Sequence, residues 1–295
     1  MRCDLHVHTV HSGMCDFPGL GGICRESYND PLALYAHLKR LGMDLVTVTD
    51  HDSIDAAETL RGLPDFFLSE EVSCVLPGRT RLHVGVYDLG ERHHVELQRR
   101  RDDLPRFLAY LREQGLFFGV NHPLSRLTGR RDAGDFEWFE GEFPAFEILN
   151  GHMPDASNRR ARALAAAFNK TGLGGSDAHT ILSAGTAFTE VAGALSKQEF
   201  LKGLRHGRGR VRGASGTYWK LTRDVLIIAA NMMRENPLAG LLTPLVLAVP
   251  LVTFANCVLE VNFSRHWAER WTAPLQDGTL PPDGRAFKKA RSLAA

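Results

Sequence analysis

The chain has 295 residues, of which 44% are hydrophobic and 23% charged, and its formal net charge is +1. This composition excludes a largely disordered chain and leaves room for one large α/β domain, or for a domain of about 200 residues with an appendage. The small net charge excludes a global electrostatic field that would attract nucleic acid or an anionic membrane, although a local patch could still do so.

The cysteines and the N-terminus both favour a cytoplasmic location. There are five cysteines, an odd number, and none form a CxxC pair, so the sequence suggests neither a disulfide framework nor a cysteine zinc site. The first residues lead directly into polar motifs, without the apolar run of a secretory signal. We therefore expect the catalytic part to face the cytosol.

Short runs rich in Val, Leu and Phe alternate with longer amphipathic ones, a pattern typical of β/α units on a mostly parallel sheet. The expected strands, in chain order, are residues 2–8, 44–49, 66–73, 81–87, 116–120, 145–149 and 172–175. Helices are expected between them, at residues 31–41, 91–114 and 155–171. The first of these helices ends on Gly42, a favourable C-cap, and Pro105 should break the second.

The main domain should end shortly after a helix that begins with a capping box. Ser196 and Glu199 form this box, and the helix should run to about His206. Residues 202–223 then contain seven Lys or Arg and no acid, which marks a linker or a surface patch. We predict a catalytic domain at residues 1–213 and an extension at 214–295, with a helix at 218–234 and a poorly ordered polar tail containing Pro281 and Pro282.

The extension contains an apolar segment, residues 238–259, which is 22 residues long and uncharged. A helix of this length could span a membrane, and its Pro244 and Pro250 would be better tolerated there than inside a soluble helix. Basic residues and tryptophans flank it. The alternative is a pair of short apolar helices packed on the main domain. We therefore expect a helical extension that could attach the protein to the cytoplasmic face of a membrane.

Side chains that bind metals follow or lie in nearly every expected strand. His6 and His8 are two apart on a strand, so they share a face, and Asp177 and His179 repeat this spacing. Other ligand-type residues at such places are Asp50, His51, Glu71, His83 and His122. In a β/α barrel the strand C-termini meet on one face, so these residues would converge there. A lone histidine is more often structural, but six with interleaved carboxylates predict a metal centre.

These residues give the chain a resemblance to the PHP (polymerase and histidinol phosphatase) family of metallophosphoesterases. The matching pieces cover about residues 1–210 and are Asp4-Leu5-His6-Val7-His8-Thr9, Thr49-Asp50-His51, Glu71-Val72-Ser73, His83, Asn121-His122-Pro123 and Gly175-Ser176-Asp177-Ala178-His179. The resemblance implies a distorted seven-stranded β/α barrel with two or three divalent ions, usually manganese, zinc or iron, at its C-terminal face.

The resemblance also implies how the ligands divide among the ions. The first ion would take His6, His8, Glu71 and Asp177. The second would take His51, His179 and a residue of the first loop, and the third would take Glu71, His83 and His122. The first-loop ligand departs from the family pattern, because the loop from Gly13 to Asp30 is long and rich in glycine. Asp16 and His11 both remain candidates, whereas Cys15 is expected to be a nearby thiol without a ligand role.

A cluster of divalent ions suits phosphate-ester hydrolysis, because it neutralises phosphate oxygens, holds an in-line geometry and acidifies a water molecule. We expect a metal-bound hydroxide to attack phosphorus, with Glu71 and Asp177 holding the metals. Asp50 would either transfer protons or orient an outer partner. Phosphate recognition favours arginine. The substrate-binding candidates are Arg126, Arg130, Asn150 and Arg159, with Arg160 as the alternative to Arg159.

No motif selects the substrate among phosphomonoesters, nucleotides and short oligonucleotides, and we expect no stable protein partner. Two other classes of protein remain open. One is a membrane-associated regulatory or scaffold protein that keeps the barrel without turnover, although its intact ligand positions argue against this. The other is a nucleic-acid-binding module that uses residues 202–223, although no aromatic stacking pattern accompanies this basic run.

Overall fold

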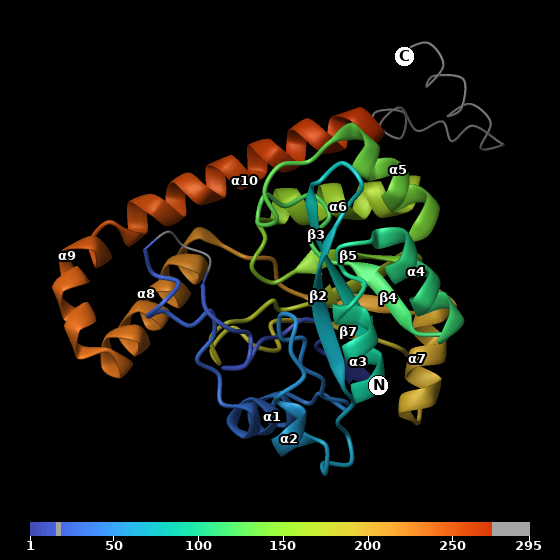
Figure 1. Cartoon of the computed structure of the whole chain (residues 1–295), viewed down its shortest axis with the longest axis horizontal. Coiled ribbons are helices and arrows are strands. Elements are labelled where there is room, and N and C mark those ends of the chain that lie inside the picture. Colours follow the sequence, from blue (N-terminus) through green and yellow to red (C-terminus); the bar gives the residue numbers. More distant parts are fainter. Residues whose placement is uncertain (16–18, 273–295) are drawn as a thin grey trace.

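The computed structural model describes residues 1–15 and 19–272, which form two β-sheets surrounded by helices (Figure 1). The larger sheet has the order β2-β3-β4-β5-β6 and the smaller one the order β1-β7-β8. The strands are β1 (Arg2–Cys3), β2 (Ser69–Val75), β3 (Arg81–Tyr87), β4 (Phe117–Val120), β5 (Ala145–Asn150), β6 (Thr171–Gly175), β7 (Ala187–Glu190) and β8 (Arg210–Gly213). The expected α/β class is therefore confirmed.

The large sheet is mixed, which corrects the expectation of a mostly parallel one. β2 pairs with β3 and β3 with β4 in antiparallel fashion, and only β4-β5-β6 is parallel. The loop between β2 and β3 is a tight turn closed by the Leu76 N–H, which donates to Thr80 O at 2.8 Å, with Arg79 at φ +60°. A connection this short can join only antiparallel neighbours.

Two of the expected strands are barely formed. Residues 2–8 pair as a strand only at β1, and residues 44–49 contribute just the isolated bridge between Val46 and Phe66. Threonine hydroxyls here bond backbone groups that would otherwise pair between strands. The Val7 N–H donates to Thr49 Oγ1 at 3.1 Å, and Thr47 Oγ1 donates to Phe67 O at 2.7 Å. The ladders of the described residues therefore form no closed seven-stranded barrel.

Several helices begin where local signals predict. They are α1 (Pro31–Arg40), α2 (Ala57–Leu60), α3 (Glu91–Gln98), α4 (Leu104–Glu113), α5 (Ala133–Glu142), α6 (Asp155–Ala167), α7 (Lys197–Arg205), α8 (Tyr218–Glu235), α9 (Thr243–Val246) and α10 (Val249–Thr272), with a 3₁₀ helix at Pro237–Leu242. The Ser196 hydroxyl caps α7 by accepting from the Glu199 N–H, as predicted. Pro105 lies in the first turn of α4, so the expected helix at 91–114 is split into α3 and α4.

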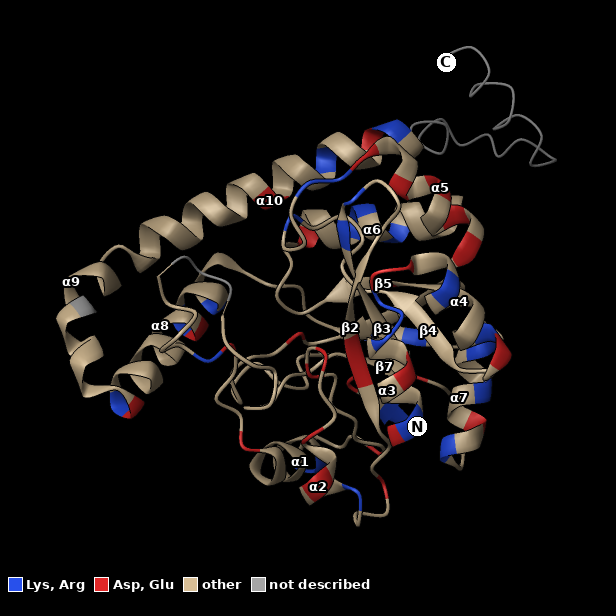
Figure 2. Cartoon of the chain, viewed as in Figure 1, with Lys and Arg blue, Asp and Glu red and all other residues tan. Residues whose placement is uncertain are grey.

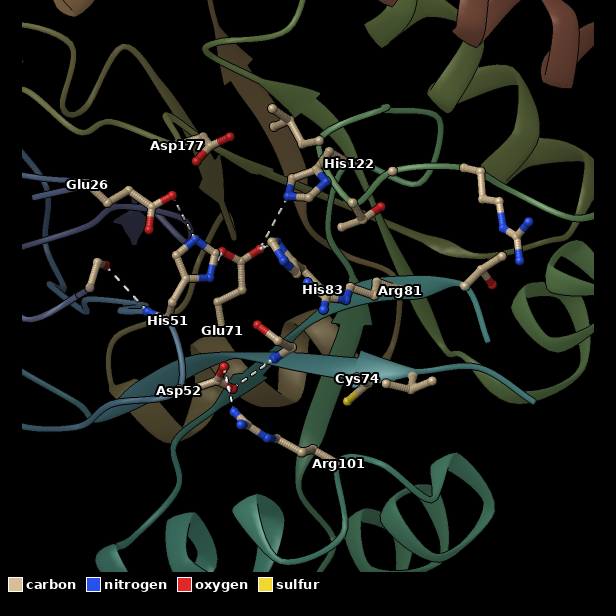
Figure 3. A pocket seen from close by; sticks show the side chains of 18 of the residues that line it. Glu26, His51, Asp52, Glu71, Cys74, Arg81, His83, Arg101, His122 and Asp177 are labelled. Atoms are coloured by element: carbon tan, nitrogen blue, oxygen red, sulfur yellow. Dashed lines mark hydrogen bonds and ion pairs between the residues drawn. The ribbon is translucent and has the colours of Figure 1, made fainter. Parts of the chain in front are cut away.

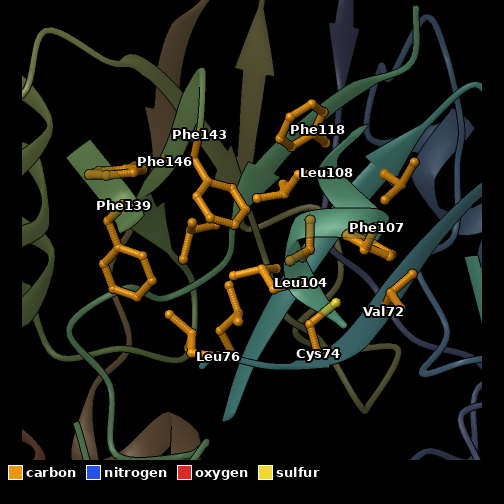
Figure 4. Close-up of a cluster of buried hydrophobic side chains, with 14 of the residues drawn as sticks. Val72, Cys74, Leu76, Leu104, Phe107, Leu108, Phe118, Phe139, Phe143 and Phe146 are labelled. Carbon is orange, nitrogen blue, oxygen red and sulfur yellow. The ribbon is translucent and has the colours of Figure 1, made fainter. Parts of the chain in front are cut away.

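The largest hydrophobic cluster lies between the large sheet and helices α3 to α6 (Figure 4). Phe118, Phe139 and Phe143 pack edge-to-face at its centre. The far end of α10 completes it, because Trp267 stacks on Phe136 with ring centroids 5.3 Å apart. Helices on both sides of residue 213 thus share one core, and the predicted domain boundary there stays a prediction.

The apolar segment at 238–259 does not form one helix, which corrects the membrane-spanning alternative. It is divided among the 3₁₀ helix, α9 and the first half of α10, with Pro244 and Pro250 each in the first turn of a helix. No helix of the described residues is both long and apolar enough to cross a membrane. We call residues 236–259 the apolar arm; they contain no Asp, Glu, Lys or Arg and project from the body of the molecule (Figure 2). The polar tail at 273–295 lies outside the described residues.

Candidate metal centre

The N-terminal motif and the Gly175–His179 motif lie side by side, although the sequence separates them widely. The Asp177 N–H donates to His6 O at 2.6 Å, the His8 N–H donates to Ala178 O at 3.1 Å, and Val7 pairs with Ala178. This pairing brings His6, His8 and Asp177 together, with one ligand atom of each within 4.8 Å of the others. All three side chains are buried, so the group can hold an ion away from bulk water.

Glu71 lies at the centre of the histidine cluster (Figure 3). Its Oε2 is 3.2 Å from His6 Nε2 and 3.3 Å from His51 Nδ1, while its Oε1 is 3.3 Å from both His83 Nδ1 and His122 Nε2. Burial raises the pKa of Glu71, but the surrounding imidazoles outweigh it and hold this pKa well below the ordinary value. The carboxylate is therefore ionised, and its two oxygens face two different groups of histidines.

Several buried imidazole nitrogens in the cluster make no hydrogen bond to any described residue. They include His8 Nε2, His83 Nδ1 and His179 Nε2, each within 3.5 Å of a carboxylate oxygen of the site. Burial and repulsion from His179 lower the pKa of His8 to about 3, which leaves its ring neutral. Unsatisfied buried nitrogens are costly, and neutral imidazoles beside carboxylates are the donor set of divalent transition metals. The residues present therefore fit metal ions.

The structure also brings a residue to the cluster that the sequence analysis did not select. Glu26 Oε1 lies 3.4 Å from His51 Nε2 and 3.5 Å from His179 Nε2. The first loop folds back on itself, since the Glu26 N–H donates to Gly13 O at 3.1 Å. Burial raises the pKa of Glu26, but the attraction of His51 and His179 lowers it by more. The net result is a pKa below the ordinary value, so this carboxylate is ionised.

Glu26 thus supplies a first-loop carboxylate where the sequence analysis considered Asp16 and His11. Asp16 lies outside the described residues, and His11 is not part of the pocket lining that those residues form. The sequence signal for Glu26 was weak, because it lies far along the loop from the HxH pair. Only the return of the loop makes it a neighbour of His51.

Buried acceptors behind the cluster orient its histidines. Asp50 accepts hydrogen bonds from the Thr9 and Ser12 hydroxyls at 2.6 and 2.8 Å, and Ser12 Oγ lies 2.9 Å from His8 Nδ1. Asp50 lies outside the pocket lining formed by the described residues, a position suited to an outer orienter. Its predicted proton-transfer role stays a prediction.

Glu147, which the sequence analysis did not select, plays the same part for His6. Its Oε1 lies 2.9 Å from His6 Nδ1, and its Oε2 accepts from the His122 N–H at 2.9 Å. Asn150 donates to both Glu147 and Asp177 at 2.9 Å, so its amide holds two carboxylates of the site in place. Each of these contacts fixes the direction in which a candidate ligand points.

Two candidate ligands have left-handed backbone conformations. The φ angle is +31° at His122 and +51° at Asp177. Such conformations are uncommon for residues other than glycine and persist where the surrounding structure enforces them. Here the backbone bonds to Glu147 and His6 do so, which turns both side chains towards the cluster.

The cluster opens into a pocket of about 910 Å³. Among the predicted substrate-binding arginines, Arg130 lines this pocket. Arg126 instead hydrogen-bonds Asn256 at 3.4 Å, and Arg159 pairs with Asp155 on the surface of α6. Arginines in the lining that the sequence analysis did not select are Arg79, Arg81 and Arg101. They lie on or near the β2–β3 hairpin, a position that only the tertiary fold defines.

The alternative to Arg159, Arg160, also points elsewhere. Its Nη1 donates to Ser264 Oγ at 3.2 Å and so links α6 to α10. Neither arginine of this pair belongs to the pocket lining of the described residues.

Comparisons with known proteins found similarity in one part of the sequence and in the fold. Residues 155–208 match the family model described as PHP-associated. The fold resembles that of a two-domain protein from Bacteroides vulgatus described as containing a predicted PHP-like metal-dependent phosphoesterase, with a TM-score of 0.56 and 18% identity. The match covers 72% of this chain and 64% of that one, so this chain corresponds to less than two thirds of that protein.

A second similar structure is PsfC from Pseudomonas syringae PB-5123, with a TM-score of 0.54 and 19% identity. This match covers 79% of the present chain and 98% of PsfC. No curated protein matches the sequence. Residues 155–208 are therefore similar to the PHP-associated family model, and the fold is similar to that of a protein described as containing a PHP-like phosphoesterase.

Proposed function

We propose that the protein is a metal-dependent phosphoesterase that hydrolyses a phosphomonoester, a nucleotide or a short oligonucleotide. The observation that carries this proposal is the Glu71 carboxylate, buried among His6, His51, His83 and His122 at 3.2 to 3.3 Å. Such a centre opens into a pocket with arginines in its wall, and arginine side chains favour phosphate binding. The name of the Bacteroides vulgatus structure supports the same chemistry.

Three groups of side chains would hold the ions. They are His6, His8 and Asp177; His51, His179 and Glu26; and Glu71, His83 and His122. Nitrogen and carboxylate ligands without thiolate suit manganese, zinc or iron. When bound, divalent ions there would neutralise phosphate oxygens and make a water molecule more acidic.

The protein's own groups would position the substrate and the ligands. Arg130 can donate to phosphate oxygens from the pocket wall, and a guanidinium can contact two of them at once. Glu147 holds the ring of His6, and Ser12 with Asp50 holds that of His8. These contacts keep the ligands preorganised, so little rearrangement is needed when the substrate binds.

The test combines metal removal with a substrate panel. The chain is stripped with a chelator, and hydrolysis of phosphomonoesters, mononucleotides, nucleoside bisphosphates and short oligonucleotides is measured before and after Mn²⁺, Zn²⁺ or Fe²⁺ is added. We expect activity only with metal, on at least one substrate class. A chain that binds none of these ions, or binds them without hydrolysing any phosphate ester, would contradict the proposal.

A further inference from the structure

A buried carboxylate from α8 reaches the edge of the metal centre. Asp224 is only 1% exposed and lies 3.1 Å from His152 Nε2, while Thr180 Oγ1 donates to it at 3.0 Å. The Ser183 hydroxyl and the Arg223 guanidinium also donate to this carboxylate. With so many donors around it, Asp224 acts as an acceptor and fixes the direction of the His152 ring.

His152 lies beside other candidate ligands, two residues after β5. Its N–H donates to Asn150 Oδ1 at 2.8 Å, and its ring stacks on His179 with centroids 5.7 Å apart and planes at 13°. The side chain is 12% exposed and lines the pocket. Ligand atoms of His152, Asp177 and His179 lie within 4.8 Å of one another.

The pair repeats an arrangement found elsewhere in this centre. His6 has an outer carboxylate in Glu147, and His8 reaches Asp50 through Ser12. In metal sites, such an outer carboxylate accepts from one ring nitrogen and leaves the other with its lone pair free for the ion. Asp224 occupies Nε2 of His152, which leaves Nδ1 for this purpose.

We propose that His152 is a further metal ligand beside Asp177 and His179, and that Asp224 of α8 is the positioning residue that presents it. This inference rests on the metal centre of the proposed function. It gives the C-terminal extension a part in the site, because α8 lies beyond the matched region at residues 155–208. Neither residue was predicted from the sequence.

The test measures metal binding in the full chain. Metal-free wild type, His152→Ala, His152→Gln and Asp224→Asn are titrated with Mn²⁺ against a chromophoric chelator, and the visible spectrum of each Co²⁺ form is recorded. His152→Gln keeps a donor for Asp224 in case the alanine variant fails to fold. His206→Ala, which removes an exposed histidine at the end of α7, is the matched control.

We expect both His152 variants to weaken Mn²⁺ binding at one site by about 100-fold and to shift the Co²⁺ bands. Asp224→Asn should weaken it by about 10-fold, because the loss of outer partners typically costs 10- to 100-fold. The control should match the wild type. If the folded His152 variants bind Mn²⁺ as the wild type does, the inference is overturned, even where their KM for substrate rises.

The two proposals fail in different ways. A wild-type chain that binds metal through His152 but cleaves no phosphate ester would overturn the proposed function and leave this inference standing. A wild type that cleaves with unchanged metal binding in the His152 variants would overturn only this inference. A wild type that binds no metal would overturn both.

Discussion

The metal centre buries charged and polar side chains, whereas the apolar arm exposes hydrophobic ones to solvent. In the centre, charged and polar groups such as Glu71, His8 and Asp177 are almost completely buried. In the arm, leucines such as Leu238 and Leu241 are 84% and 83% exposed. Both arrangements are unfavourable for an isolated chain, since buried charge needs a partner and exposed apolar surface favours removal from water.

The two regions differ in what compensates the unfavourable free energy of each arrangement. Within the centre, carboxylates and imidazoles partly compensate one another: attraction from Glu71 and Glu26 outweighs burial and raises the pKa of His51 to about 10. A divalent ion can take over this compensating charge. The leucines of the arm, in contrast, stay exposed to solvent in the part of the chain that the structure describes. The sequence-based prediction that the arm associates with a membrane stays a proposal.

The largest effect is expected from removing a central ligand. Glu71→Ala should lower kcat/KM by about 10³-fold or more, since metal ions supply several kcal/mol of transition-state stabilisation. Metal content measured on the same sample should fall as well. A variant that retains its metals and more than a tenth of the wild-type activity would show that Glu71 does not hold the centre.

The next largest effect is expected on the free energy of unfolding, where α10 packs against the hydrophobic core. Trp267 is 8% exposed and stacks on Phe136, so Trp267→Ala should lower the free energy of unfolding by about 3–5 kcal/mol. Denaturant unfolding would measure it. Arg265→Ala, an exposed position on the same helix, is the control; equal losses in the two variants would mean that α10 is not anchored through Trp267.

A smaller effect is expected behind the ligands. Glu147→Gln keeps the shape of the side chain but removes the carboxylate that lies 2.9 Å from His6 Nδ1. We expect a 10- to 100-fold loss of metal affinity or activity, which is typical for outer partners of metal ligands. Chelator competition and steady-state kinetics would measure it. Unchanged values would mean that the His6 ring is held by its packing alone.

The smallest effect on the enzyme is expected from the arm. Replacing Leu238, Leu241 and Leu245 with Ser should leave turnover and the unfolding midpoint nearly unchanged, because all three are exposed. Sedimentation with vesicles of neutral and anionic phospholipid should fall at least about tenfold. If wild type and variant sediment with vesicles equally, the proposed membrane association is wrong.

Local patterns predicted many of the elements well. The strand at 81–87 was predicted with the observed bounds, and α1, α7 and α8 begin at the predicted residues. These elements carry their own signals, such as the Ser196 cap. α5 was not predicted. For the apolar segment at 238–259, one membrane-spanning helix and a pair of short helices were both open, and the structure divides the segment among shorter elements.

The sequence by itself determined which residues gather at the centre, because motifs at the ends of strands lie on the same face of an α/β fold. His6, His8, His51, Glu71, His83, His122, Asp177 and His179 are all there. Only the tertiary structure decided that the large sheet is mixed and that Glu26, Glu147, His152 and Asp224 join the site. Glu26 depends on the fold of a long loop, Asp224 on the docking of α8, and Glu147 and His152 on where β5 lies in the sheet. These are long-range contacts that no local spacing encodes.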